Sequence, residues 1–116
     1  MKLPNLEHAV VPEAKVTEYL LSLGHPVGGP KAAFFARFGF SVEAWDVLAA
    51  ALLRHVADHD VAATRPTAFG TRYVVEGPLE TPDGRDPRIR SVWFVRRGAS
   101  APRLVTAYPV SARRAR

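Results

Sequence analysis

Two hydroxyl side chains stand close together in the last strand-like segment of the sequence, residues 103–110. Thr106 and Tyr108 are two residues apart, so they should project from one face of an extended chain, together with Leu104. Both faces of the segment are rather apolar, which favours a central strand. Adjacent hydroxyls on a sheet suit a site that grips a phosphate. The plain alternative is a structural tyrosine whose buried hydroxyl finds one partner.

A glycine-rich loop at residues 24–31 brings a histidine and a lysine to the start of a predicted helix. Glycines let the backbone approach a ligand, and a helix N-terminus offers free N–H groups and a positive dipole end. The loop is not a Walker A motif, because Lys31 comes one position late and Ala32 replaces the Mg²⁺-binding Ser or Thr. His25 and Lys31 remain as a possible acid–base pair. Alternatively, the loop is a helix–helix turn whose His and Lys are merely solvated.

Arginines alternate along the predicted strand 88–96. Arg88, Arg90 and Arg96 share one face with Phe94, whereas Trp93 belongs to the other face and is expected in the core. Guanidinium groups on an open sheet face would bind phosphates through paired N–H donors. We therefore predict Arg72, Arg88 and Arg96 as substrate-binding residues, with Arg90 paired with Arg88 at one end of the strand. A solvated face explains the same pattern.

His55 and His59 lie one helical turn apart, with Asp58 and Asp60 beside them. Two histidines at this spacing can share a metal ion. No firm third ligand is evident, and the dipole favours histidine near a helix C-terminus in any case. We therefore predict no metal site.

The first half of the chain has helical periodicity. Pro12 and Glu13 begin a helix that Gly24 ends. A second, short helix begins near Pro30 and ends at Gly39, and a third runs from a Ser41 cap to about residues 55–59. Apolar residues at three- and four-residue spacing should form the buried faces: Val16, Tyr19, Leu20 and Leu23 in the first helix, and Trp45, Leu48, Leu52 and Val56 in the third.

The period changes at residue 61. Strands are expected at 61–67, 70–76, 88–96 and 103–110, with a turn at 81–84. Helices followed by closely connected strands predict an α+β domain, in which N-terminal helices pack on one face of a four-stranded antiparallel sheet. We expect one domain over residues 1–116, with helices at about 12–59, the sheet at about 61–110 and a basic tail at 111–116.

Charge is unevenly distributed along the chain. The net charge is +5, and residues 61–116 hold eleven arginines against four acidic residues. An arginine-rich half indicates a phosphate-rich partner. A genome-wide preference for Arg explains the residue type equally well, but not its placement. The chain has no Cys, no apolar run long enough for a membrane span and no secretory signal pattern, so we expect a cytoplasmic protein without disulfides.

Four strings carry a family resemblance: HPVGGPKA (25–32), YVVEGPL (73–79), RSVW (90–93) and LVTAYP (104–109). Together they resemble an uncharacterised family of small bacterial domains, a domain of unknown function found alone and in toxin- or phage-associated proteins. The order of elements and the closing Thr-x-Tyr-Pro strand are also similar to the metal-free RNase superfamily of barnase, EndoU, the colicin nucleases and RelE.

This resemblance implies a toxin-type endoribonuclease that needs neither metal nor cofactor. The RNA 2′-hydroxyl would attack the adjacent phosphate, with His25 as general base or acid. Lys31 and Arg90 would stabilise charge, and Thr106 and Tyr108 would orient phosphate oxygens. An inhibitory protein partner is an implied possibility. Unlike that superfamily, the chain has no histidine on a strand, and a non-catalytic module that binds nucleic acid or protein through the basic sheet is the alternative.

Overall fold

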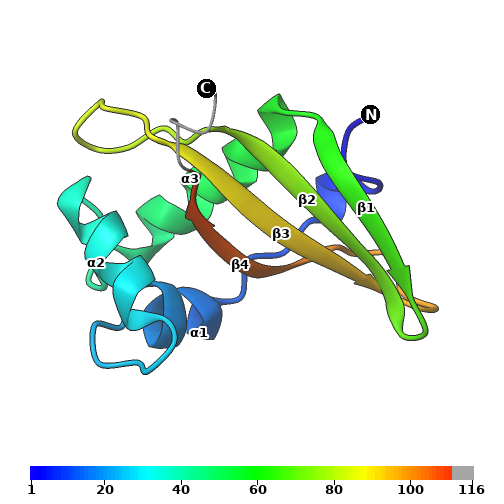
Figure 1. Ribbon diagram of the computed structural model, residues 1–116, viewed down its shortest axis with the longest axis horizontal. Helices are drawn as coiled ribbons and strands as arrows, with labels where there is room; N and C mark the ends of the chain where they lie inside the picture. The colour runs from blue at the N-terminus through cyan, green and yellow to red at the C-terminus, as the bar shows by residue number, and fades with distance from the viewer. Residues whose placement is uncertain (111–116) are drawn as a thin grey trace.

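A computed structural model describes residues 1–110 of the chain and shows helices followed by four strands (Figure 1). The α+β class expected from the sequence is confirmed. The tail at 111–116 lies outside the described residues. In chain order the elements are η1 (Leu6–His8), α1 (Glu13–Lys15), the π-helical turn η2 (Val16–Leu20), α2 (Gly29–Arg37), α3 (Trp45–Asp58), β1 (Val61–Thr67), β2 (Gly70–Pro78), β3 (Arg88–Arg96) and β4 (Arg103–Pro109).

The strands form one antiparallel sheet in the order β1-β2-β3-β4, so each strand pairs with its neighbours in sequence. A two-residue turn connects β1 to β2. There the hydroxyl oxygen of Thr67 accepts hydrogen bonds from the backbone N–H groups of Phe69 and Gly70. The Thr67 side chain thereby provides hydrogen-bond partners for the turn. The two-residue length of the turn fixes the register of the hairpin.

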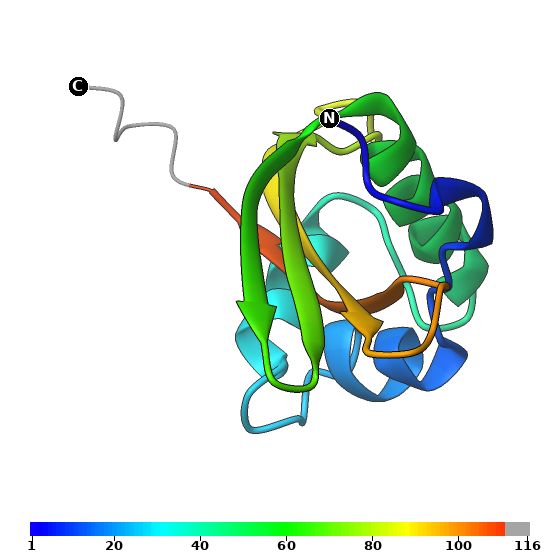
Figure 2. The ribbon, with the colours of Figure 1, turned by 90° about the vertical axis from the view of Figure 1, so that its right-hand side faces the viewer.

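Helix α3 packs against one face of the sheet, over β2 and β3 (Figure 2). Its apolar stripe meets the alternate strand residues that point toward it, as the periodicity predicts. Trp93 is fully buried in this layer, in agreement with the sequence prediction. The layer contains Leu48, Leu52, Val56, Val75, Ile89, Trp93 and Leu104. We call the side of the sheet that faces α3 the core face, and the opposite side the open face.

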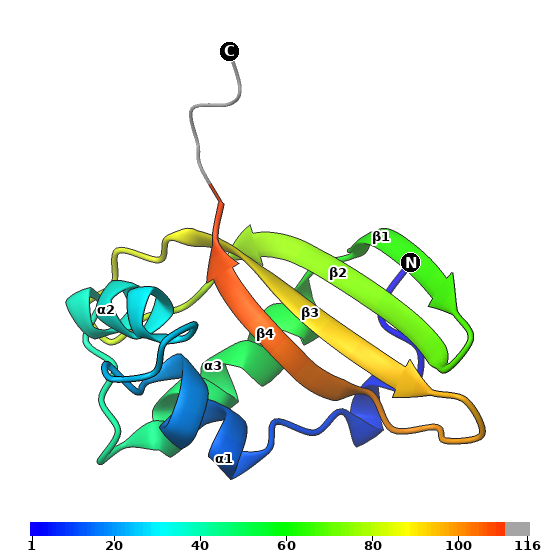
Figure 3. The same cartoon turned by 60° about the horizontal axis from the view of Figure 1, so that its bottom comes forward.

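The shorter helices α1, η2 and α2 lie beside β4 at one edge of the sheet (Figure 3). The prediction that β4 is a central strand is wrong, because β3 is its only strand neighbour in the described sheet. Its apolar character has another cause. The chain around Val10 hydrogen-bonds to the start of β4, through Val10 N–H to the Pro102 carbonyl and Leu104 N–H to the Val10 carbonyl, and covers part of this edge.

A β-bulge in β4 corrects the predicted faces of this strand. Val92 pairs with Thr106, but the next residue, Trp93, pairs with Leu104, so Val105 is the extra residue. Leu104 therefore joins the core face and is buried. The pairing leaves Thr106 and Tyr108 on the open face, and the expectation that Leu104 shares their face is wrong.

The first helix is shorter than predicted. Its α-helical turn passes directly into the wider π turn, which buries Val16 and Leu20 but ends before Leu23. Leu23 is 69% exposed, so its predicted place on the buried face is wrong. The third helix begins at Trp45 instead of next to Ser41, whose hydroxyl accepts a hydrogen bond from Ala44 N–H in the preceding turn. Among residues 1–110, no helix has the length and apolarity needed to cross a membrane.

Candidate functional site

Three polar side chains form a row across the open face. Strand register places Glu76 of β2 opposite Arg90 of β3, and Arg90 opposite Tyr108 of β4. The Arg90 Nε–H donates to the Glu76 carboxylate, and Arg88 approaches the other carboxylate oxygen at 4.0 Å. The bond to Glu76, followed by the interaction with Tyr108, raises the pKa of Arg90. The row therefore holds a permanently charged guanidinium between a carboxylate and a phenol, partly open to solvent.

A tyrosine from the helical region reaches the same strand. The Tyr19 hydroxyl lies 3.2 Å from the Thr106 hydroxyl, and either oxygen can be the donor. Thr106 and Tyr108 are alternate residues of β4, so this contact is adjacent to the Arg90 row. Sequence periodicity assigned Tyr19 only to the buried face of a helix. The π turn explains its different role, because the widened backbone carries Tyr19 to the edge of β4.

Two lysines surround the Tyr19 ring. Lys15 Nζ lies 5.2 Å and Lys31 Nζ 5.5 Å from the ring centroid. Burial alone would raise the pKa of Tyr19, but the hydrogen bond with Thr106 and the positive charges of Lys31 and Lys15 outweigh it, so the pKa is lowered. A phenol in these surroundings gives up a proton more readily than an ordinary tyrosine. Lys31 and Thr106 thus both contact Tyr19, one at its ring and the other at its hydroxyl.

His25 shapes the loop that packs on Tyr19. Its Nδ1 accepts hydrogen bonds from the backbone N–H groups of Val27 and Gly28, at 3.0 and 2.8 Å, and its ring lies edge-on to Tyr19 with centroids 5.1 Å apart. Gly28 is essential to this packing, because a Cβ there would lie 2.2 Å from the Tyr19 carbonyl oxygen. Because Nδ1 is an acceptor, the proton of the neutral ring is on Nε2.

The predicted substrate-binding arginines divide between two ends of the open face. Arg88 approaches Glu76, near the Arg90 row. Arg72 pairs with Phe94, and Arg96 is the last residue of β3, opposite Gly70. The structure therefore joins the predicted site residues His25, Lys31 and Thr106 through Tyr19, places Arg90 and Tyr108 next to them, and sets Arg72 and Arg96 farther along the strands.

Sequence reasoning missed Tyr19 and Glu76. Tyr19 carried a weak signal, because a hydroxyl on an otherwise apolar helix face needs a polar partner when it is buried. Glu76 carried no such signal, because its role depends on its position opposite Arg90 in the sheet. Nine residues separate β2 from β3, so no short turn fixes that register from sequence.

The histidine pair of α3 belongs to the core. His55 Nδ1 lies 3.0 Å from the Ser91 hydroxyl, and Nε2 lies 3.0 Å from the Gly77 carbonyl oxygen. Trp93 Nε1–H donates to the same Ser91 oxygen. Burial lowers the pKa of His55 to about 4, against the opposing effect of the Gly77 carbonyl. Within residues 1–110, no group of three or more His, Cys, Asp or Glu side chains is arranged to hold a metal ion.

Comparison with curated proteins and with solved structures finds no match. Residues 2–111 match a family described as a domain of unknown function, DUF6883. The match covers nearly the whole chain, including every side chain of the candidate site. The protein therefore belongs to the DUF6883 family.

Proposed function

We propose that this protein is a metal-independent, toxin-type endoribonuclease whose substrate lies on the open face beside β4. The observation that carries the proposal is the hydrogen bond between Tyr19 and Thr106. It joins the lysines of the helical region to the strand that also presents Tyr108 to Arg90. Cations and hydroxyls at this junction would supply the charge stabilisation that transfer of a phosphoryl group needs.

In the proposed reaction the RNA 2′-hydroxyl attacks the adjacent phosphorus. A 2′-O–P bond forms and the 5′-O–P bond breaks, which leaves a 2′,3′-cyclic phosphate and a free 5′-hydroxyl. The Glu76 carboxylate takes the proton of the 2′-hydroxyl, and Tyr19 gives a proton to the departing 5′-oxygen. The lowered pKa of Tyr19 supports this role, because a good general acid must release its proton readily.

The remaining residues would bind the phosphate. Arg90 and Lys31 stabilise the negative charge that builds up on its oxygens, and Tyr108 and Thr106 orient it. His25 acts by positioning Tyr19, because its Nδ1 is occupied by the two backbone N–H groups of its own loop. Proton transfer is thus assigned to Glu76 of β2 and to Tyr19, which is hydrogen-bonded to β4, instead of to His25.

Charge supports RNA as the substrate. The described part of the basic half presents Arg72, Arg88, Arg90 and Arg96 from β2 and β3, and arginine binds phosphate through paired N–H donors. An inhibitory protein partner, if the enzyme has one, would cover the same face with carboxylates. Such a partner would compete directly with RNA for the arginines of this face.

Purified protein incubated with single-stranded RNA in EDTA tests the proposal. We expect products that end in a 2′,3′-cyclic phosphate, and rates about 100-fold lower for Arg90→Ala and for Tyr19→Phe. Arg54→Ala is the matched control. Arg54 lies on α3 in an exposed ion pair with Glu80, so the substitution removes the same charge away from the site. Intact RNA with folded wild-type protein over a range of pH, or equal losses in Arg54→Ala, would contradict the proposal.

A non-catalytic module that binds RNA or an acidic protein is the second candidate. It is favoured by Arg72, Arg96 and Arg103, which have no carboxylate within 4.0 Å among residues 1–110. In a binding module, loss of these arginines weakens affinity, and Tyr19→Phe leaves function unchanged. In the enzyme, Tyr19→Phe slows cleavage while RNA affinity is nearly kept.

A further inference from the structure

A pocket of about 600 Å³ opens at the far end of the open face from the Arg90 row. It lies where the end of β3, the β3–β4 connection and the start of β4 meet the segment leading into α1. Its size falls within the range of small-ligand sites, about 300–1,000 Å³. The lining residues that bear on its chemistry are Pro12, Lys15, Phe94, Arg96, Arg103 and Leu104.

The pocket is cationic, and its cations are free of acidic partners. Within the described chain, Lys15, Arg96 and Arg103 have no carboxylate within 4.0 Å, and no acidic residue lines the pocket. Arg54 and Arg90, by contrast, are each paired with a glutamate. Three unpaired positive charges around one hollow favour an anionic ligand.

Phe94 gives the pocket an aromatic wall. It projects from the open face between Arg72 of β2 and Arg103 of β4, and it is only half-buried. The place of its ring depends on Gly70, because a Cβ there would lie 2.7 Å from Phe94 Cζ and 2.2 Å from the Val95 carbonyl oxygen. The ring is partly exposed and has guanidinium groups on both sides. Such surroundings suit a nucleobase that carries phosphates.

We infer that this pocket binds one nucleotide of a single-stranded nucleic acid, with the base stacked on Phe94 and its phosphate held by Arg103, Arg96 and Lys15. The inference rests on the proposed function and deepens it. Lys15 also lies over the Tyr19 ring, and Val105 of the pocket precedes Thr106. The bound nucleotide is therefore a neighbour of the one whose phosphate is cut.

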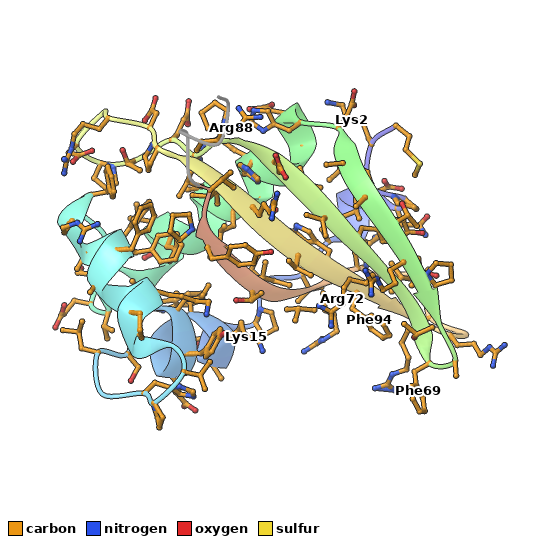
Figure 4. All side chains as sticks on the ribbon, in the orientation of Figure 1. Lys2, Lys15, Phe69, Arg72, Arg88 and Phe94 are labelled. Atoms are coloured by element: carbon orange, nitrogen blue, oxygen red, sulfur yellow. The ribbon has the colours of Figure 1, made fainter. Side chains whose placement is uncertain are left out.

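Affinity for an uncleavable probe tests the subsite without relying on catalysis. We would titrate full-length protein with a 2′-O-methyl tetranucleotide by calorimetry, and compare Phe94→Leu with wild type. Loss of the stacking surface should weaken binding about tenfold. Phe69→Leu is the matched control, because Phe69 is 76% exposed at the tip of the β1–β2 hairpin and does not line the pocket (Figure 4). It should change affinity less than about twofold.

Two further probes separate base from phosphate. A tetranucleotide with abasic sugars should bind wild type and Phe94→Leu equally, whereas Arg103→Ala should weaken binding of both tetranucleotides. Inorganic phosphate alone should bind much more weakly than the tetranucleotide. Equal affinity of folded Phe94→Leu and wild type for the complete probe would overturn the subsite, as would an equal Phe94→Leu loss for the abasic probe.

The outcomes for the subsite and for the nuclease are distinguishable. Binding that depends on Phe94 in a protein that leaves RNA intact would support the subsite and remove the nuclease. If the wild-type protein cleaves RNA but Phe94→Leu leaves probe affinity unchanged, the nuclease is supported and the subsite is removed. Thermal unfolding of each variant shows that the protein compared is folded.

Discussion

The two faces of the sheet carry polar side chains in opposite states. On the core face, His55, Ser91 and Trp93 share hydrogen bonds, and burial keeps His55 uncharged. On the open face, Arg90 is charged and Tyr19 has a lowered pKa, both within reach of solvent. Groups whose partners are all internal stabilise a fold, whereas groups that keep charge at a surface are available to a ligand. We therefore propose that the two faces of the sheet divide stability from function.

Removing His55 should have the largest effect on stability. His55→Ala removes the hydrogen bonds to the Gly77 carbonyl and the Ser91 hydroxyl, which then keeps only its bond from Trp93, and it opens a cavity in the core. The free energy of unfolding should therefore fall by about 3 kcal/mol. Urea denaturation measures this change. Cleavage of RNA by the folded fraction should be unaffected, because His55 does not reach the open face.

Two variants serve as controls for His55→Ala. His59→Ala removes a half-buried ring and should cost less than about 1 kcal/mol. Thr106→Val removes an open-face hydroxyl and should cost about as little, while it slows cleavage. A cost for Thr106→Val equal to that of His55→Ala would show that the two faces do not divide their roles.

Acid should destabilise the protein through the same histidine. The pKa of His55 is about 4 in the folded protein and about 6.5 in an unfolded chain, so the unfolded state binds more protons below pH 6.5. Stability is complete above that pH and is lost as the pH falls toward 4. Between pH 7 and pH 5 the loss should be about 2 kcal/mol. His55→Gln should show a much smaller change over this interval, and a wild-type stability independent of pH there would contradict the buried neutral state.

Strand positions and faces follow from sequence where the pattern is local. The alternation of residues 88–96 predicts both the bounds of β3 and the separation of Trp93 from Phe94, and the structure confirms them. In α3, spacing alone identifies Leu48, Leu52 and Val56 as buried. These features depend on burial repeated at a fixed period, which a single sequence displays.

The errors arise where the backbone departs from a regular period. A π turn places Tyr19 at β4 and leaves Leu23 exposed, and a bulge at Val105 moves Leu104 to the core. Neither irregularity has a sequence signal here. The contact between Tyr19 and Thr106 also spans 87 positions, so no spacing rule could predict it. The residue types of Thr106 and Tyr108 were enough to single them out in the sequence. Only the folded structure identifies Tyr19 as the partner of Thr106.

A DNA oligonucleotide with one internal ribonucleotide tests most directly that the open face cuts RNA by attack of a 2′-hydroxyl. Only the single ribose carries the nucleophile, so wild-type protein in EDTA should cut once, on its 3′ side, and leave a 2′,3′-cyclic phosphate. The all-DNA strand should stay intact, and Tyr19→Phe should cut the chimera far more slowly. Cleavage of the all-DNA strand at the same rate, or an intact chimera with folded protein from about pH 5 to pH 9, would contradict this mechanism.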